Sequence, residues 1–170
     1  MASDIGDRPI EILLVEDNPA DFRLAQDTIE RSNQRANITH AEDGEIALSI
    51  LKKEGEHSNA ARPDLILLDL RLPKKDGTEV LAEINQDEDL VSIPVMLLTG
   101  TEAESSLLES YSIPPSRYAR KPLQLEQFHR ALGQMGLFSR QPISIPTQQQ
   151  VQQAASESSS GGRRWWWPFG

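Results

Sequence analysis

The stretch "DLILLDLRLPKKDG", residues 64–77, places four consecutive apolar residues directly before a carboxylate, Asp69. An unbroken apolar run of strand length is typical of a central strand that is buried on both faces of a parallel sheet. Pro73 and the Asp76-Gly77 pair, which follow, are turn residues. The charge of Asp69 therefore stands where a buried strand leaves the core.

Strand-length apolar runs and amphipathic segments alternate along the chain. The runs cover residues 10–15, 36–41, 64–68 and 93–98, with a weaker fifth at 117–120. Helical patterns begin at Asn18-Pro19, after Asp43, near Thr78, near Glu102 and at Leu125, the last continuing through Phe128, Leu132 and Met135. Asparagine followed by proline is a typical helix start. Five strand–helix units predict an α/β fold, with a single doubly wound five-stranded parallel sheet and five helices.

The composition bounds both the size and the partners of the protein. Its 170 residues, enough for one domain of ordinary size, carry a formal net charge of −9 and include no cysteine. The acidity argues against a direct nucleic-acid partner, and the lack of cysteine excludes disulfides and thiolate metal sites. The N-terminus lacks the pattern of a signal peptide, and no window approaches the about 20 apolar residues of a membrane span. We therefore expect a cytoplasmic protein.

The composition changes near residue 139. We expect an N-terminal extension at 1–8, one folded domain over 9–139, and a low-complexity, mostly disordered tail at 140–170 that is rich in Gln, Ser, Pro and Gly. The tail ends in "RRWWWPFG", residues 163–170, which holds all three tryptophans. This end is either nonfunctional or a docking element for a partner or a membrane surface, because tryptophan buries a large area and keeps a polar group.

Polar residues follow four of the predicted strands. Glu16 and Asp17 come after the first, Asp69 after the third, Thr99 after the fourth and Lys121 after the fifth. Each alone has an ordinary structural explanation, such as a turn or a solvated lysine. In a doubly wound fold, however, they meet at the carboxyl edge of the sheet, where ligands bind.

Three carboxylates in one small site repel one another unless cations compensate. Mg²⁺ fits, because it binds one or two carboxylates together with waters and phosphate oxygens. Lys121 and Thr99 would add a fixed positive charge and a hydroxyl donor, which makes a phosphoryl site. Asp69, on the central strand, is the best placed covalent acceptor of a phosphoryl group.

The motifs around these residues resemble those of the CheY-like receiver domain of bacterial two-component response regulators. The matching text is "ILLVEDNP" (12–19), "DLILLDLRLPKKDG" (64–77), "VMLLTG" (95–100) and "YARKP" (118–122). Four such motifs in this order are highly specific. The resemblance implies a receiver domain over 9–139 with the flavodoxin/CheY-like strand order 2-1-3-4-5, phosphorylated by a histidine kinase.

The resemblance also assigns a role to each matching residue. It implies that Asp69 takes the phosphoryl group and that Thr99 and Lys121 hold its oxygens. Tyr118 would be an aromatic switch that follows Thr99 inward, although by itself it reads as a half-buried strand residue. The implied Mg²⁺ ligands are Asp17, Asp69 and the backbone carbonyl of Arg71, with Glu16 acting directly or through water, and Pro122 is an implied cis-proline. Apart from the resemblance, Gly100 would leave an acyl phosphate sterically open, and we expect Arg71 and Thr101 to modulate the access of water to it.

A finer resemblance is to the small stand-alone regulators that serve phytochrome kinases. It rests on "LVEDNPADFRLAQDTIE" (14–30) and "LPKKDGTEVLAEI" (72–84). The segment "YSIPPSRY" (111–118) departs from the short turn usual before the fifth strand, which puts the inherited partner surface in doubt. The about 31 residues after the receiver region are too few for an effector domain, so we expect output through protein contacts, a homodimer or a downstream phosphotransfer protein.

Two other functions compete with the regulator. Phosphatases of the haloacid dehalogenase class also use a strand-end aspartate, Mg²⁺, a hydroxyl and a lysine, but they need an acid two residues after the nucleophile. Arg71 stands there, so we expect no enzymatic turnover. The other alternative is an unphosphorylated scaffold. The presence of every residue that phosphorylation requires argues against it.

Overall fold

The computed structural model describes residues 7–160, and within this range it describes all side chains except those of 148 and 157–160. Five strands form one sheet in the order β2-β1-β3-β4-β5, and all four neighbouring pairs are parallel, as the sequence predicted. The strands are β1 (Ile10–Val15), β2 (Ala36–Ala41), β3 (Leu65–Asp69), β4 (Val95–Thr99) and β5 (Tyr118–Arg120).

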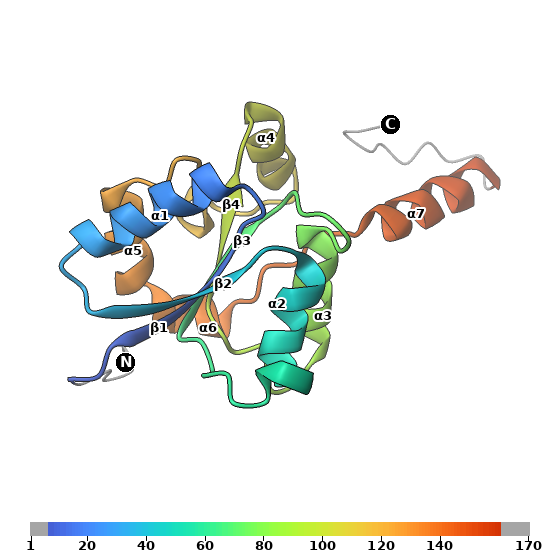
Figure 1. Cartoon of the computed structure of the whole chain (residues 1–170). Coiled ribbons are helices and arrows are strands. Elements are labelled where there is room, and N and C mark those ends of the chain that lie inside the picture. The colour runs from blue at the N-terminus through green and yellow to red at the C-terminus, as the bar shows by residue number, and fades with distance from the viewer. Residues whose placement is uncertain (1–6, 161–170) are drawn as a thin grey trace.

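Helices cover both faces of this sheet (Figure 1). In the described part of the chain they are α1 (Pro19–Arg31), α2 (Gly44–Lys52), α3 (Gly77–Gln86), α4 (Glu102–Ser110), α5 (Leu125–Gly133), α6 (Met135–Arg140) and α7 (Gln148–Ser160), with short 3₁₀ turns at Gly55–His57 and Pro115–Arg117. Figure 1 shows α1 and α5 on one side of the sheet and α2 and α3 on the other. The arrangement is doubly wound.

Two apolar clusters fill the spaces between sheet and helices, because alternate residues of each central strand point to opposite faces. Ile66 and Leu68 of β3 belong to the cluster under α2, α3 and α4. Leu65 and Leu67 belong to the cluster under α1, α5 and α6. All four are completely buried, which explains why the residues before Asp69 form an unbroken apolar run.

Side-chain caps fix where three of the helices begin. Asn18 accepts hydrogen bonds from Ala20 N–H and Asp21 N–H, Asp43 accepts one from Ile46 N–H, and Thr101 accepts one from Glu104 N–H. These caps satisfy backbone donors that a helix leaves free in its first turn. Since α1 and α4 begin directly after β1 and β4, the caps also set the direction of the loops at the carboxyl edge.

The C-terminal part of the fold differs from expectation. The last predicted helix is interrupted at Gln134 into α5 and α6, and α7 is a further helix, so the described residues contain two helices beyond the five expected. The segment between α6 and α7 places Ile143 and Ile145 in the core, each only 5% exposed. Their i, i+2 spacing lets an extended segment bury both side chains, a local pattern that the polar average composition of the tail concealed.

Neither end of the chain is fully covered by the structure. Arg8, in the expected N-terminal extension, donates two hydrogen bonds to the carboxylate of Asp64, at 2.7 and 2.8 Å. The segment "RRWWWPFG" lies outside the described residues. Within residues 7–160, none of the helices has the length and apolar character needed to cross a membrane.

Candidate functional site

Three carboxylates meet at the carboxyl edge of the sheet. Glu16 and Asp17 follow β1 directly, and Asp69 is the last residue of the neighbouring strand β3. One oxygen of each lies within 4.8 Å of the others. Glu16 and Asp69 are only 1% and 2% exposed, whereas Asp17 is exposed. The parallel pairing of β1 with β3 therefore produces the acidic cluster that the sequence predicted.

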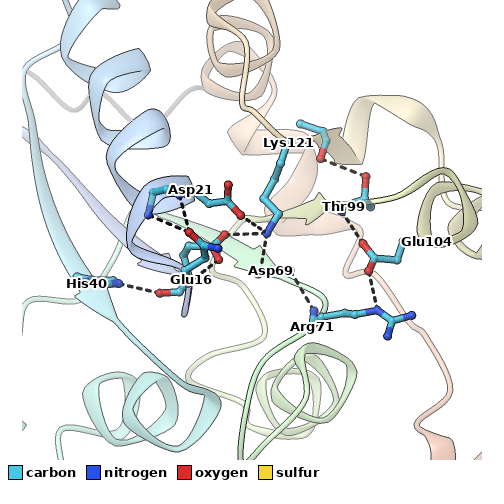
Figure 2. A network of polar contacts seen from close by, with 12 residues as sticks. Glu16, Asp21, His40, Asp69, Arg71, Thr99, Glu104 and Lys121 are labelled. Carbon is cyan, nitrogen blue, oxygen red and sulfur yellow. Dashed lines mark hydrogen bonds and ion pairs between the residues drawn. The ribbon is translucent and has the colours of Figure 1, made fainter.

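Lys121, directly after β5, reaches into this cluster (Figure 2). Its Nζ lies 2.8 Å from Asp69 Oδ2 and 3.1 Å from Glu16 Oε2. A third contact joins it to Asp21 Oδ2 in the first turn of α1, also at 3.1 Å. One ammonium thus neutralises part of the charge of three acids, and net negative charge remains.

Burial and charge shift the ionisation of this group. Burial is the main reason why the pKa of Glu16 is raised to about 7; the N–H of Asn18 opposes the shift and the charge of Asp69 adds to it. Burial by itself would lower the pKa of Lys121, but the hydrogen bonds and charges of Asp69, Glu16 and Asp21 outweigh it and raise that pKa. The lysine therefore stays an ammonium at neutral pH.

The donor set fits a hard divalent cation. Glu16, Asp17 and Asp69 offer three carboxylate oxygens close together, and such oxygens suit Mg²⁺, Mn²⁺ or Ca²⁺. The nearby charge of Asp69 also contributes to the raised pKa of Glu16, although burial contributes more. A second positive charge is what the cluster lacks.

Thr99 and Tyr118 lie near this edge, but the hydrogen bonds of their hydroxyl groups are to residues other than Asp69. The fully buried Thr99 has its Oγ1 3.1 Å from Ser105 Oγ and donates to the carbonyl of Ala119 at 3.4 Å. The half-buried Tyr118 donates to Glu109 of α4, also at 3.4 Å. Both predicted residues therefore connect the edge of the sheet to α4 and β5.

The loop after β3 is held close to the strand end. Arg71 N–H donates to Asp69 Oδ1 at 3.0 Å, and Gly77 N–H donates to the carbonyl of Leu70 at 3.0 Å. A Cβ at Gly77 would lie 2.3 Å from the carbonyl oxygen of Asp69, so only glycine permits this approach. On the other side of the site, the bond between Lys121 and Pro122 is cis, as expected.

Two residues at the site were not singled out from the sequence. Asp21 contacts Lys121, and its signal was its place as an acid in the first turn of a predicted helix, close in sequence to Glu16 and Asp17. Glu104 is buried at 6% exposure and accepts hydrogen bonds from Arg71 and Gly100. Its signal was the sequence Thr-x-x-Glu at residues 101–104, which reads as an ordinary capping box.

Comparison with known proteins assigns the family. The sequence model of the response regulator receiver domain family matches residues 12–133. This range includes all five strands, apart from the first two residues of β1. The chain belongs to the response regulator receiver domain family. It is 40% identical, over 144 residues, to the response regulator Rcp1 of Synechocystis sp., covering 85% of this chain and 98% of Rcp1.

Solved structures agree with this assignment. The receiver domain is similar to the bacteriophytochrome response regulator AtBRR, with a TM-score of 0.69 and 34% identity over 83% of this chain and 99% of AtBRR. It is also similar to the Mn²⁺-bound form of Rcp1 and to the phosphorylated cyanobacterial phytochrome response regulator RcpA, each with a TM-score of 0.61, 41% identity, and coverage of 82% of this chain and all of the other.

The family gives this receiver domain its general role. It is a response regulator with a phosphoacceptor role in signalling, its relatives include regulators linked to phytochromes, and receiver domains interact with histidine kinases. Receiver domains bind a divalent metal, which agrees with the acidic cluster at its carboxyl edge.

Proposed function

We propose that Asp69 is the residue that accepts the phosphoryl group. The observation that carries this is the position of its carboxylate: at the end of the central strand, almost completely buried, 2.8 Å from the ammonium of Lys121 and beside the acids Glu16 and Asp17. No other described carboxylate combines a strand end, this ammonium and the acidic pair.

The transfer follows from the chemistry of a carboxylate. An oxygen of Asp69 attacks the phosphorus of a kinase phosphohistidine, an O–P bond forms and the P–N bond breaks. The bonding electrons stay on the imidazole nitrogen, and the imidazole leaves neutral because its other nitrogen carries a proton. Water later cleaves the acyl phosphate to inorganic phosphate and returns Asp69.

The surrounding side chains bind and orient the group. Lys121 holds one phosphoryl oxygen, and Thr99 donates to another once it gives up Ser105 and Ala119, a change that Tyr118 follows by leaving Glu109. Glu16, Asp17, Asp69 and the backbone carbonyl of Arg71 are the proposed Mg²⁺ ligands. When bound, Mg²⁺ neutralises charge on the phosphoryl oxygens during transfer. We propose that Arg71, Gly100 and Thr101 modulate the access of the attacking water.

The test is phosphorylation from a small donor. The chain is incubated with acetyl phosphate and Mg²⁺, and intact mass is measured over time for wild type, Asp69→Asn and the loop control Asp76→Asn. We expect one phosphoryl group per chain in wild type and in the control, and none in Asp69→Asn. Stoichiometric phosphorylation of Asp69→Asn at the wild-type rate would sink the proposal.

The same assay decides between the competing functions. Continuous release of phosphate over many turnovers would indicate a phosphatase, and no adduct under any condition a scaffold. The guanidinium of Arg71 faces Glu104 and cannot serve as a general acid, which supports a receiver without enzymatic turnover.

The proposed phosphate donor is a histidine kinase of the phytochrome type. Support comes from the similarity to Rcp1, AtBRR and RcpA, two of which are described as phytochrome or bacteriophytochrome regulators. Transfer rates from a panel of autophosphorylated kinases, phytochromes included, test this. Fastest transfer from a kinase without a phytochrome sensor would contradict it.

The proposed output is a contact surface around α4 and β5, used by a phosphotransfer protein or a second copy.

The segment "RRWWWPFG" is proposed to dock on a partner or a membrane surface. Because all three tryptophans stand at 165–167, tryptophan fluorescence reports on this segment alone. Addition of anionic liposomes should shift the emission to shorter wavelength if the segment binds lipid, and sedimentation should be lost when residues 161–170 are removed. An unchanged spectrum with liposomes excludes membrane binding and leaves partner docking or a nonfunctional end.

A further inference from the structure

The buried carboxylate of Glu104, in the first turn of α4, lies between two donors at the site. Its Oε1 accepts a hydrogen bond from Arg71 Nε at 2.7 Å, and its Oε2 accepts one from Gly100 N–H at 2.5 Å. Figure 2 shows Glu104 between Arg71 and the end of β4 that carries Thr99. The carboxylate thus joins the loop after β3 to the loop after β4.

This arrangement is not the capping box that the sequence suggests. In a capping box, the glutamate at the third helical position would accept from the N–H of the cap residue, Thr101. Only one half of that pattern is present, in which Thr101 Oγ1 accepts from Glu104 N–H at 3.2 Å. The carboxylate of Glu104 turns instead to Gly100 and Arg71, so helix capping alone does not account for its position.

Both donors that Glu104 occupies lie beside the proposed phosphoacceptor. Arg71 is two residues after Asp69, and its backbone N–H already donates to Asp69 Oδ1. Gly100 directly follows Thr99, and a Cβ at this position would lie 3.6 Å from Lys121 Cε. The Nζ of the same lysine is 2.8 Å from Asp69 Oδ2. An anion held by Gly100 and Arg71 therefore lies next to the place where a phosphoryl group would form.

A phosphoryl group on Asp69 would add about 1.5 to 2 negative charges and three acceptor oxygens. Its oxygens need N–H donors and cationic groups, and they repel a carboxylate close by. Glu104 and the phosphoryl group therefore compete for Gly100 and Arg71.

We propose that Glu104 is an internal competitor of the phosphoryl group, a positioning residue that holds Gly100 and Arg71 in the unphosphorylated state and releases them on phosphorylation. This rests on the proposed function, because it needs Asp69 as acceptor. Displacement of Glu104 loosens the first turn of α4, where the adjacent Ser105 contacts Thr99. The last turn of the same helix carries Glu109, which contacts Tyr118. Binding at Asp69 and the state of α4 are then reciprocally coupled.

The test uses beryllofluoride with Mg²⁺, an unreactive analogue of the phosphoryl group. Its dissociation constant is measured by calorimetry for wild type, Glu104→Gln and Glu104→Ala. The matched control is Glu102→Gln, in the same helical turn, whose exposed carboxylate pairs with Arg120. Competition predicts that both Glu104 variants bind about 5–30-fold tighter, the size of a typical coupling between sites, and that Glu102→Gln changes binding less than about 2-fold.

The direction of the change separates competition from a structural role. If Glu104 only stabilised the site, its removal would weaken binding. Equal or weaker binding by both Glu104 variants overturns the inference, provided that wild type binds the analogue and Asp69→Asn does not. If wild type itself neither binds the analogue nor takes up phosphate, the proposed function fails instead.

A measurement on the wild-type chain does not depend on the folding of any variant. In ¹⁵N spectra, addition of beryllofluoride should shift the Arg71 Nε–H signal, because its acceptor changes. The corresponding signal of Arg8, whose guanidinium pairs with Asp64 far from the site, should stay in place. An Arg71 signal that does not move would contradict the exchange of partners.

Discussion

Lys121 Nζ lies 2.8 Å from Asp69 Oδ2, and the same ammonium is 3.1 Å from the buried carboxylate of Glu16. The lysine therefore supports the fold as well as the chemistry, since without it two buried carboxylates would face each other. Figure 2 shows how its side chain passes between α1 and the end of β3.

Replacement of Lys121 by methionine should lower the free energy of unfolding by about 2 kcal/mol, between the values typical of exposed and of buried ion pairs. Mg²⁺ should restore more stability to this variant than to wild type, because it replaces the missing positive charge. Urea unfolding at constant ionic strength measures both. Lys52→Met, which removes an exposed pair with Glu83, is the control and should cost less than about 1 kcal/mol. Equal losses in both variants would contradict the role of Lys121.

Gly77→Ala should destabilise the protein by about 1–3 kcal/mol, the range typical of overpacked sites. The added Cβ would lie 2.3 Å from the carbonyl oxygen of Asp69, which is backbone and cannot move away cheaply. The loop after β3 should shift, so phosphorylation from acetyl phosphate should slow as well. Gly133→Ala, at the end of α5, is the control and should be neutral or stabilising, because the new Cβ would have no side chain or other segment of the described chain within 4 Å beyond its own neighbours.

Asp64 should make stability depend on pH in the acid range. Its pKa is lowered, chiefly by the hydrogen bond from Arg8, with a further contribution from Glu11 N–H. A carboxyl with a lowered pKa stabilises the fold above its ordinary pKa of about 4, and the contribution disappears as pH falls through the folded-state value. Wild type should therefore be more stable than Asp64→Asn at pH 7, and the difference should vanish in strong acid. A difference between wild type and Asp64→Asn that stays constant over this pH range would refute the linkage.

The segment after α6 should contribute to stability in spite of its polar composition. A chain that stops after Arg140 loses Ile143 and Ile145 from the core and the hydrogen bond from buried Arg117 to the carbonyl of Gln141. We expect the free energy of unfolding to fall by about 3 kcal/mol. Each buried isoleucine contributes roughly 1.5–3 kcal/mol, but the unfolded chain already buries part of the same apolar surface. A chain that stops after Ser160 should unfold at the same urea concentration as the full chain. If both truncated chains match wild type, the packing of the two isoleucines contributes nothing measurable.

The strands and the identity of the site could be predicted because their signals are local. The run at 10–15 is β1 without change, and the unbroken run before Asp69 is the central strand β3. Asn18-Pro19 does start α1. Since parallel strands bring their carboxyl ends to one edge, locating the strands also located Glu16, Asp69, Thr99 and Lys121.

Local sequence patterns did not identify side chains whose partners lie far along the chain. Thr101-x-x-Glu104 reads as a capping box, but only the fold brings Arg71, from 33 residues earlier in the chain, within 2.7 Å of that carboxylate. Asp21 reads as an acid in the first turn of a helix, and its contact with Lys121 spans 100 residues. The helix break at Gln134 was missed because the apolar spacing continues to Met135, although Gly133 is a residue that often ends helices.

The sequence by itself determined the order of elements, the parallel sheet and the set of acidic, hydroxyl and ammonium groups at its edge, because periodicity and capping act within a few residues. Tertiary structure decided which of these groups contact one another. It decided that Lys121 bridges Asp69, Glu16 and Asp21, that Glu104 holds Arg71 and Gly100, and that Ile143 and Ile145 complete the core. Such contacts depend on distances between segments far apart in the chain, and short-range patterns carry no information about those distances.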